Sequence, residues 1–370
     1  MREVVRYQAK FIVLMSCEGV KMLFITNRKL TLIKGSTSYQ MVLDNPALDP
    51  DPQPGDMVTM DPNDNRMTQS VHYCETTGNA NEFHVVGSEE LLSRLKDNES
   101  DNATATNLLL YIHGFNNLPR DVLNRAKELQ WMCDKQAGNA KEKRVEVIPI
   151  IWPCESTTPL IKKYWDDEDT AQMSGQQSFS RLLARFMDWR AAQEQKNTPC
   201  YKRINILSHS MGNAVLMYTL GQWARSKGGI PQLFRNIFMM SADIPNEALE
   251  DGEPGEAIPD AARNVVVYYA GDDMAMTASK VANVKNGQFT RRLGHTGPEH
   301  MEKTPNNVYA LDCDVFNNKA DAIKGHAYFL DFMGDGNPTP AFKNMFVTMT
   351  SPAGHVAMPV DSNGRRGVLK

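Results

Sequence analysis

In the stretch INILSHSMGNAVL, residues 204–216, most polar residues lie where a predicted apolar strand would pass into a predicted apolar helix. Its centre is Ser210, with Ser208 two positions before it and Gly212 two positions after it. A sharp strand-to-helix turn strains its central residue and needs small residues at those two positions. The usual pattern is G-x-S-x-G, and here a serine replaces the first glycine. The stretch predicts Ser210 as a nucleophile, with an ordinary loop serine as the alternative.

A serine nucleophile needs a base, an acid that orients the base, and N–H donors for the oxyanion. In chains with this kind of turn the order is serine, acid, histidine. The run VVVYYAGDD ends in Asp272 and Asp273, and IFMMSAD ends in Asp243. We favour Asp273, because the later strand more often carries the acid, and keep Asp272 and Asp243 as alternatives. A turn-forming or capping role is the competing interpretation for each.

Histidines downstream of these carboxylates are candidates for the base. His326, in DAIKGHAYFLDF, follows a glycine at the start of a predicted apolar helix, and we assign it as the base. His295 lies in the polar loop RRLGHTGPEH and is expected to shape the pocket. His355 lies in the C-terminal tail, where fixed geometry is harder to maintain. His209 adjoins the nucleophile, and neighbours on a tight turn point apart.

The segment YIHGFNN, residues 111–117, closes an earlier apolar strand. Oxyanion donors in this arrangement come from the residue after the nucleophile and from such a loop, so we predict the backbone N–H groups of Met211 and Phe115. For His113 a structural role that braces the loop is preferred, Asn116 could instead cap the next helix, and Trp152 and Tyr164 could be simple core residues. The residues assigned to the substrate pocket are His113, Gly114, Asn116, Trp152, Tyr164 and His295.

These residues need a scaffold, and apolar runs bounded by turn residues supply one. The runs are continuous rather than alternating, as expected for parallel strands covered on both faces. They lie at 22–26, 108–114, 145–152, 204–210, 236–243 and 264–273. Helical periodicity occurs between them, at 122–136, 179–195 and 214–225. The alternation predicts an α/β protein with a mostly parallel central sheet and helices on both faces.

The chain divides into three expected parts. Residues 1–100 are predicted to be an N-terminal extension that adds strands to the sheet, and 101–338 the catalytic domain. Within that domain, 152–180 is a candidate lid or pocket wall. Residues 339–370 contain many helix and strand breakers, which predicts a loosely packed C-terminal tail.

Composition excludes several classes of protein. The net charge is only −4 over 370 residues and no Lys/Arg run occurs, so neither a nucleic-acid nor a membrane-surface partner is expected. No apolar stretch approaches the ~20 residues of a membrane span. The run 11–15 is shorter than the roughly 7–15 residues of a signal core, which favours the cytoplasm. Export, or a lipoprotein anchor at Cys17, is the alternative. The sequence does not indicate an oligomeric state.

Metal and cofactor chemistry find little support. H-E-x-x-H, Walker A and G-x-G-x-x-G motifs are missing from the sequence, so we expect no metal and no cofactor. The acidic patch at 164–171 is more typical of a solvated helix start than of a metal site. Six scattered cysteines without a C-x-x-C pair favour free, buried thiols, although one or two disulfides are the alternative.

With these motifs in order, the chain resembles the bacterial α/β-hydrolases of the DUF900 group, from about residue 22 to 332. The resemblance rests on FITNRK, YIHGFNN, WP with a following Tyr-x-x-Asp-x-x-x-Ala, SHSMGN, SADIP, YAGDDMAM, RLGHTGP and GHAYF. It implies an α/β-hydrolase fold with Ser210 as nucleophile, Asp273 as acid and His326 as base. Met276 stands where the family tends to have leucine, and Asp272 where a neutral residue is usual. Which of the two adjacent carboxylates meets the imidazole therefore stays open.

The expected activity is cleavage of a small carboxylic ester through an acyl-enzyme. An acyltransferase, thioesterase or amidase would use the same three residues, and a polyester depolymerase is a narrower version of the esterase. A non-catalytic binding protein on the same fold is the alternative from another class.

Overall fold

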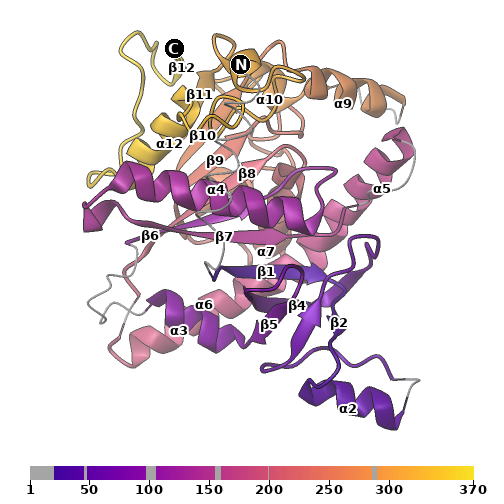
Figure 1. Ribbon diagram of the computed structural model, residues 1–370. Helices are drawn as coiled ribbons and strands as arrows, with labels where there is room; N and C mark the ends of the chain where they lie inside the picture. Colours follow the sequence, from indigo (N-terminus) through magenta and orange to yellow (C-terminus); the bar gives the residue numbers. More distant parts are fainter. Residues whose placement is uncertain (1–20, 46–47, 97–105, 155–159, 199, 286–289) are drawn as a thin grey trace.

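The computed structural model describes residues 21–45, 48–96, 106–154, 160–198, 200–285 and 290–370, and its centre is a 12-stranded sheet (Figure 1). The strand order is β12-β11-β10-β9-β8-β6-β7-β1-β4-β5-β3-β2. From β12 to β1 all neighbours pair in parallel. These strands are β1 (Leu23–Arg28), β6 (Asn107–Ile112), β7 (Val145–Ile151), β8 (Arg203–His209), β9 (Phe234–Met240), β10 (Ala262–Tyr269), β11 (Val308–Asp312) and β12 (Arg366–Val368).

The first part of the chain extends this sheet with antiparallel strands. β4 pairs with β1, β5 with β4, β3 with β5 and β2 with β3. The four added strands are β2 (Thr31–Leu32), β3 (Met57–Thr59), β4 (Met67–Thr76) and β5 (Phe83–Val86). α2 (Thr37–Asp44) projects from this end of the molecule (Figure 1).

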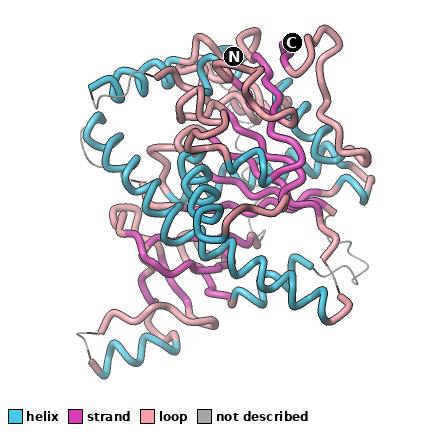
Figure 2. Tube along the Cα trace, turned by 180° about the vertical axis from the view of Figure 1, so that it is seen from behind, coloured by secondary structure: helices cyan, strands magenta, loops and turns pink. Residues whose placement is uncertain are grey.

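Helices cover both faces of the parallel part (Figures 1 and 2). One core layer contains side chains of α3 (Ser88–Lys96), α5 (Leu160–Met173), α6 (Ser180–Gln195), α7 (Gly212–Lys227) and α8 (Ala257–Ala261), and a π-helical turn, Ser174–Phe179, joins α5 to α6. The other contains those of α4 (Pro119–Ala137), α11 (Asn317–Ala320) and α12 (Pro340–Thr350). The remaining helices are the 3₁₀ turn Lys141–Lys143, α9 (Met274–Lys285) and α10 (Leu293–Thr296).

Strand side chains alternate between the two core layers. In β6, Leu108 and Ile112 face the layer of α6 and α7, while Leu109 and Tyr111 face that of α4. Because both faces are covered, the strands read as continuous apolar runs. The predicted α/β class with a mostly parallel sheet is confirmed.

The structure differs from the sequence predictions at the C-terminus. Residues after Pro338 are not a loosely packed tail, because α12 buries Phe342, Met345 and Met349 completely and β12 pairs with β11. The Thr339 hydroxyl caps α12 by accepting the Phe342 N–H. This cap and the helical spacing of the apolar residues stabilise the helix despite the helix-breaking residues on either side of it. The boundaries at residues 100 and 338 stay predictions, and residues 11–15 and Cys17 lie outside the described residues.

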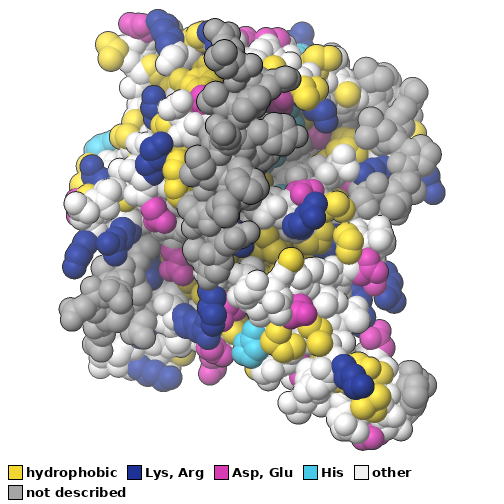
Figure 3. Space-filling view, in the orientation of Figure 1, with side chains coloured by type: hydrophobic (Ala, Val, Ile, Leu, Met, Phe, Trp, Pro, Cys, Tyr) yellow, Lys and Arg dark blue, Asp and Glu magenta, His cyan; other side chains and the backbone are white. Residues whose placement is uncertain are grey.

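Three further features of the described residues concern the helices, the surface charges and the cysteines. Within the described ranges, no helix has the length and apolar character needed to cross a membrane. Figure 3 shows basic side chains in separate groups between acidic ones on the face in view, without a continuous basic patch. The five described cysteines are free, and all but Cys200 are buried.

Candidate active site

Ser210 lies in the turn between β8 and α7 with φ 54°, in the left-handed region that non-glycine residues rarely adopt. Hydrogen bonds hold this strained turn: the Ser210 N–H donates to Met240 O at 3.0 Å, and the Asp243 N–H donates to Ser210 O at 3.2 Å. A Cβ on Gly212 would lie 2.6 Å from His113 O. The small residue predicted after the serine is therefore needed because the turn packs directly against the end of β6.

Asp273 and His326 meet at the same edge of the sheet. His326 Nδ1 lies 2.7 Å from Asp273 Oδ2, and the Asp273 side chain is fully buried. The other carboxylate oxygen accepts the N–H groups of Ala275 and Met276 at the start of α9, at 2.9 and 3.1 Å. A carboxylate held this way fixes the ring and places its proton on Nδ1, which leaves Nε2 as the basic nitrogen.

His326 stands in a loop, and the helix predicted to begin there does not form. The Asp321 carboxylate instead accepts N–H groups of the loop, among them that of His326 at 3.2 Å. Gly325 has φ 62°, which breaks helical geometry next to the histidine. The carbonyl of His326 accepts the Ser241 hydroxyl at 3.0 Å, and the His209 and His326 rings lie 4.7 Å apart. These contacts bring the loop of His326 to the turn that contains Ser210.

The Ser210 hydroxyl is not hydrogen-bonded to His326, or to any other side chain of the described residues. Ser210 is only 5 % exposed and the His326 side chain 12 %. The structure therefore brings His326 and Asp273 into contact, and the loop of His326 meets the turn of Ser210 through His209 and Ser241. Hydrogen bonds between nucleophile and base are often long in free enzymes and tighten when substrate binds.

The loop after β6 runs against the turn of Ser210. A Cβ on Gly114 would lie 2.7 Å from the Ser210 Cβ, so only glycine lets the two backbones approach this closely. Phe115 follows immediately, and Asn117 Nδ2 donates to the carbonyls of Gly114 and Phe115 at 3.0 and 2.9 Å. In the described part of the chain, the N–H groups of Met211 and Phe115 are not donated to other protein groups.

Gly114→Ala is expected to lower the free energy of unfolding by about 1–3 kcal/mol, because the added methyl group overpacks the contact with Ser210. Gly78→Ala is the matched control, since a Cβ there meets nothing within 4 Å, and it should change stability by less than about 0.5 kcal/mol. Urea unfolding of the two variants measures the difference. Equal stabilities would show that the loop does not press on the nucleophile turn.

His113 braces this loop, which is the structural role that we preferred above to a role in the substrate pocket. It is completely buried and stacks on Trp152 with ring centroids 5.2 Å apart. Its Nε2 accepts the Trp152 N–H at 3.1 Å, so the proton sits on Nδ1, which donates to Gly114 O at 2.9 Å. Trp152 is also fully buried. Neither side chain can line a pocket open to substrate, which corrects their assignment there.

Burial lowers the pKa of His113 from 6.5 to about 4. Between these two values the unfolded chain binds more protons than the native chain, so stability is full above pH 6.5 and falls as the pH drops towards 4. For His113 alone, the loss between pH 7 and pH 5 is about 2 kcal/mol. We expect the free energy of unfolding of His113→Gln, measured with urea, to decline less between pH 7 and pH 5 than that of the wild type. His355→Gln is the control because His355 is exposed, and its stability should decline as in the wild type. An unaltered decline in His113→Gln would contradict the assignment.

Asp243 belongs to a buried polar network and does not contact His326. Its carboxylate accepts the hydroxyl groups of Tyr164, at 2.9 Å, and Ser279, at 2.5 Å. Arg292 Nε lies 3.2 Å from the same carboxylate, with both side chains 2 % exposed. The Tyr164 ring packs edge-on against Phe115 at 5.7 Å. The network therefore links α5, the loop after β9 and the start of α10 to the loop with Phe115.

Arg292 and Ser279 have no sequence signal that would single them out, because each is a lone polar residue whose partner is distant in the chain. The other predicted residues are placed as follows. Asp272 is exposed, and its carboxylate accepts the side-chain amides of Asn317 and Asn318, whereas His326 contacts Asp273. Asn116 accepts from Lys163 and does not cap α4. His295 is half-buried in α10, and no hydrogen bond between described residues joins its ring to His326.

Comparisons with known proteins agree with this architecture. The sequence matches the family described as "Alpha/beta hydrolase of unknown function (DUF900)" over residues 88–332. The fold and the turn at Ser210 thus define an α/β hydrolase. Since the match covers more than half of the chain, the protein belongs to the DUF900 family.

More distant comparisons add little. The crystal structure of the gene lin2722 products from Listeria innocua is 11 % identical, with 71 % of this chain and 98 % of that chain covered and a TM-score of 0.31. A likeness this remote carries no argument about function. No curated protein matches the sequence.

Proposed function

We propose that the protein is a serine hydrolase that cleaves a small carboxylic ester through an acyl-enzyme intermediate. The observation that carries the proposal is the 2.7 Å contact between His326 Nδ1 and the buried Asp273 carboxylate. The second support is the strained turn of Ser210, at φ 54°, whose neighbour His209 has its ring 4.7 Å from that of His326. Such strain persists only where the surrounding structure imposes it, and it clusters at functional sites.

The chemistry follows from the atoms available. His326 Nε2 takes the proton of the Ser210 hydroxyl while the oxygen attacks the ester carbonyl, and the N–H groups of Met211 and Phe115 bind the resulting oxyanion. The tetrahedral intermediate collapses, and the leaving alkoxide takes the proton from His326. Water then attacks the acyl-enzyme, with His326 again as base, and releases the acid. Asp273 stabilises the imidazolium form in both halves.

The proposed substrate pocket lies between the loop after β6 and α5. Gly114 and Asn116 would form one wall, with His295 nearby on α10. Tyr164 is a positioning residue in this proposal, since its hydroxyl is committed to Asp243 and Ser279 and its ring packs on Phe115. The segment 152–180 is proposed as the pocket wall or lid that this tyrosine anchors.

A panel of p-nitrophenyl esters of graded acyl length tests the proposal. We expect Ser210-dependent release of nitrophenol with at least one chain length. Parallel assays on acyl thioesters, anilides and alcohol acceptors distinguish a thioesterase, an amidase or an acyltransferase. A folded protein that hydrolyses none of these substrates would favour a binding protein on the same fold.

Asp273→Asn is expected to reduce turnover by roughly 10²–10⁴-fold, because the amide cannot stabilise the imidazolium or hold the productive tautomer. Asp272→Asn is the control and should retain turnover within a few-fold, since its carboxylate faces Asn317 and Asn318. Steady-state ester hydrolysis measures both. The reverse ranking of the two variants would move the acid to Asp272.

We place the protein in the cytoplasm. The support is that the five described cysteines are unpaired, as is usual for proteins of a reducing compartment.

A further inference from the structure

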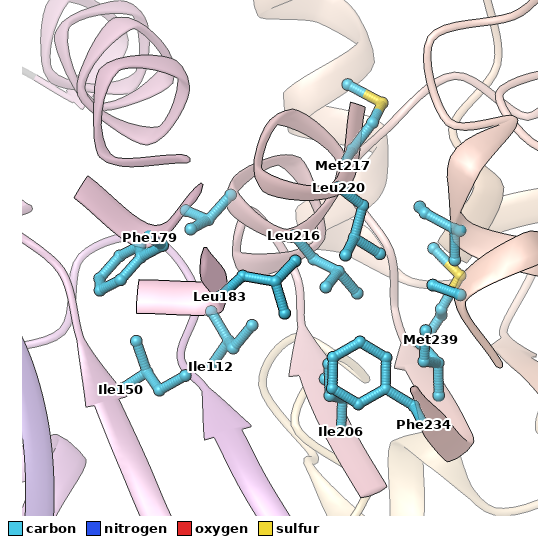
Figure 4. Close-up of a cluster of buried hydrophobic side chains, with 14 of the residues drawn as sticks. Ile112, Ile150, Phe179, Leu183, Ile206, Leu216, Met217, Leu220, Phe234 and Met239 are labelled. Atoms are coloured by element: carbon cyan, nitrogen blue, oxygen red, sulfur yellow. The ribbon is translucent and has the colours of Figure 1, made fainter. Parts of the chain in front are cut away.

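A cavity inside the core has an almost entirely apolar lining. It has a volume of about 100 Å³ and lies between β6–β8 and the helices α3, α6 and α7. Figure 4 shows Ile112, Ile150 and Ile206 of the strands on one side and Phe179 and Leu183 on the other. Among the described lining residues, Tyr73 and Thr219 carry hydroxyl groups, and the Thr219 hydroxyl donates to Val215 O of its own helix at 2.7 Å. Apolar cavities of this size stay dry and bind apolar molecules.

The cavity is long and accessible. Leu108, Leu110 and Ile112 of β6 all line it, which is a length of about 13 Å along the strand. Leu110 lies in the middle of a central strand, yet it is only partly buried, as are Leu182 and Phe186 on α6. A well-packed core would bury the central leucine fully. The space is therefore shaped for a linear apolar chain.

A polar cleft of about 520 Å³ adjoins the cavity, and Tyr73 and Leu182 line both spaces. Tyr73 is 3 % exposed, and among the described residues its buried hydroxyl has no well-formed hydrogen bond, although the Arg185 side chain is close enough to interact with it weakly. The pKa of this hydroxyl is raised by burial, while the nearby Arg185 charge opposes that rise. An unsatisfied buried hydroxyl is costly, so a polar group at this boundary would stabilise the protein.

The two arginines of the cleft offer partners for an anion. Arg181 and Arg185 lie one turn apart on α6, and the first residues of the nine-residue helix α3, Ser88 and Glu89, line the cleft opposite them. The N–H groups at a helix start attract negative charge. Two carboxylates also face the cleft, those of Glu89 and Asp51, and Asp51 accepts the Ser70 hydroxyl at 2.6 Å. His72, the remaining titratable side chain there besides Tyr73, is kept neutral because burial lowers its pKa.

We propose that these adjoining spaces form a binding site for a medium-chain alkanoate, separate from the Ser210 site. The carboxylate lies in the cleft between Arg181, Arg185 and the start of α3, and it accepts a hydrogen bond from Tyr73. The alkyl chain passes Tyr73 and Leu182 into the apolar cavity. Binding at this site does not use the Ser210 hydroxyl, so the proposal can be tested independently of the proposed hydrolase activity.

Isothermal titration of the full chain with acetate, hexanoate, octanoate and decanoate, below micelle-forming concentrations, tests the proposal. Each added pair of methylenes should tighten binding roughly tenfold, with acetate too weak to detect. Arg181→Gln/Arg185→Gln should weaken decanoate binding at least tenfold. Arg190→Gln, on the same helix outside the cleft, should leave it unchanged. Ser210→Ala should also bind decanoate as wild type does.

Four results would overturn the proposal. These are no decanoate binding by wild type, affinity that does not rise with chain length, equal affinity in the double arginine variant, and stronger binding of decyltrimethylammonium than of decanoate. A fifth outcome, loss of decanoate binding on covalent modification of Ser210, would assign the ligand to the hydrolase pocket and likewise refute a separate site.

Discussion

Replacement of Ser210 by alanine is expected to lower ester turnover by at least about 10³-fold while the variant folds normally. Without the hydroxyl no acyl-enzyme can form, and only binding and oxyanion stabilisation remain. Alanine fits the turn sterically, because the backbone there is already imposed by hydrogen bonds to Met240 and Asp243. Turnover of the best p-nitrophenyl ester, together with the melting temperature, measures the effect.

The control for this prediction is Ser226→Ala. Ser226 lies near the end of α7, where its hydroxyl donates to the Trp223 carbonyl at 2.9 Å, far along the helix from the turn. Its turnover should match that of the wild type. If Ser210→Ala retains more than about one tenth of wild-type activity, the hydrolysis measured does not use this serine.

His326→Ala is expected to match the loss in Ser210→Ala, because the hydroxyl of an unassisted serine is a poor nucleophile near neutral pH. The histidine is held by Asp273 and by the N–H contacts of its loop with Asp321. Both its protonation site and its position are therefore set by the fold. Steady-state kinetics across the ester panel measures the loss.

His295→Ala is the informative comparison, since His295 was the rival histidine in the sequence. It is half-buried in α10 and is not hydrogen-bonded to Asp273, whose partner is His326. We expect this variant to alter KM for some esters and to retain kcat within about tenfold. An active His326→Ala together with an inactive His295→Ala would transfer the role of base to His295.

Much of the scaffold was predictable because covered parallel strands leave a strong signal. The runs at 108–114, 145–152, 204–210 and 236–243 all correspond to strands of the sheet. β11 was missed because it is five residues long, and β12 is only three. The antiparallel strands β2–β5 were expected only as an early strand or hairpin, since pairing between distant segments has no local signature.

The candidate site was predictable as far as residue type and chain order define it. The pattern around Ser210 and the order of the later residues indicated which side chains to seek, and the contact of His326 with Asp273 agrees with the preferred choice of acid. What the sequence did not provide was the surroundings. Asp243 was kept as an alternative acid because it also follows an apolar strand, and only the fold reveals that its carboxylate contacts Arg292 and Tyr164 instead.

His326 illustrates the same limit. Glycine before an apolar run predicted a helix, whereas the side chains of Tyr328, Phe329 and Leu330 are buried from an irregular loop. Asp321 and Asp331 accept the loop N–H groups that a helix would otherwise pair internally. Side-chain acceptors compete with helix formation in this way, and their effect depends on tertiary position.

Labelling with a fluorophosphonate probe tests the central claim most directly, because the reagent modifies a serine only when a base and an oxyanion site activate it. The account predicts that mass spectrometry finds the label on Ser210 of the wild type, that His326→Ala is labelled far more slowly, and that Ser210→Ala is not labelled. A folded wild-type protein that stays unmodified, or carries the label on another residue, would contradict it.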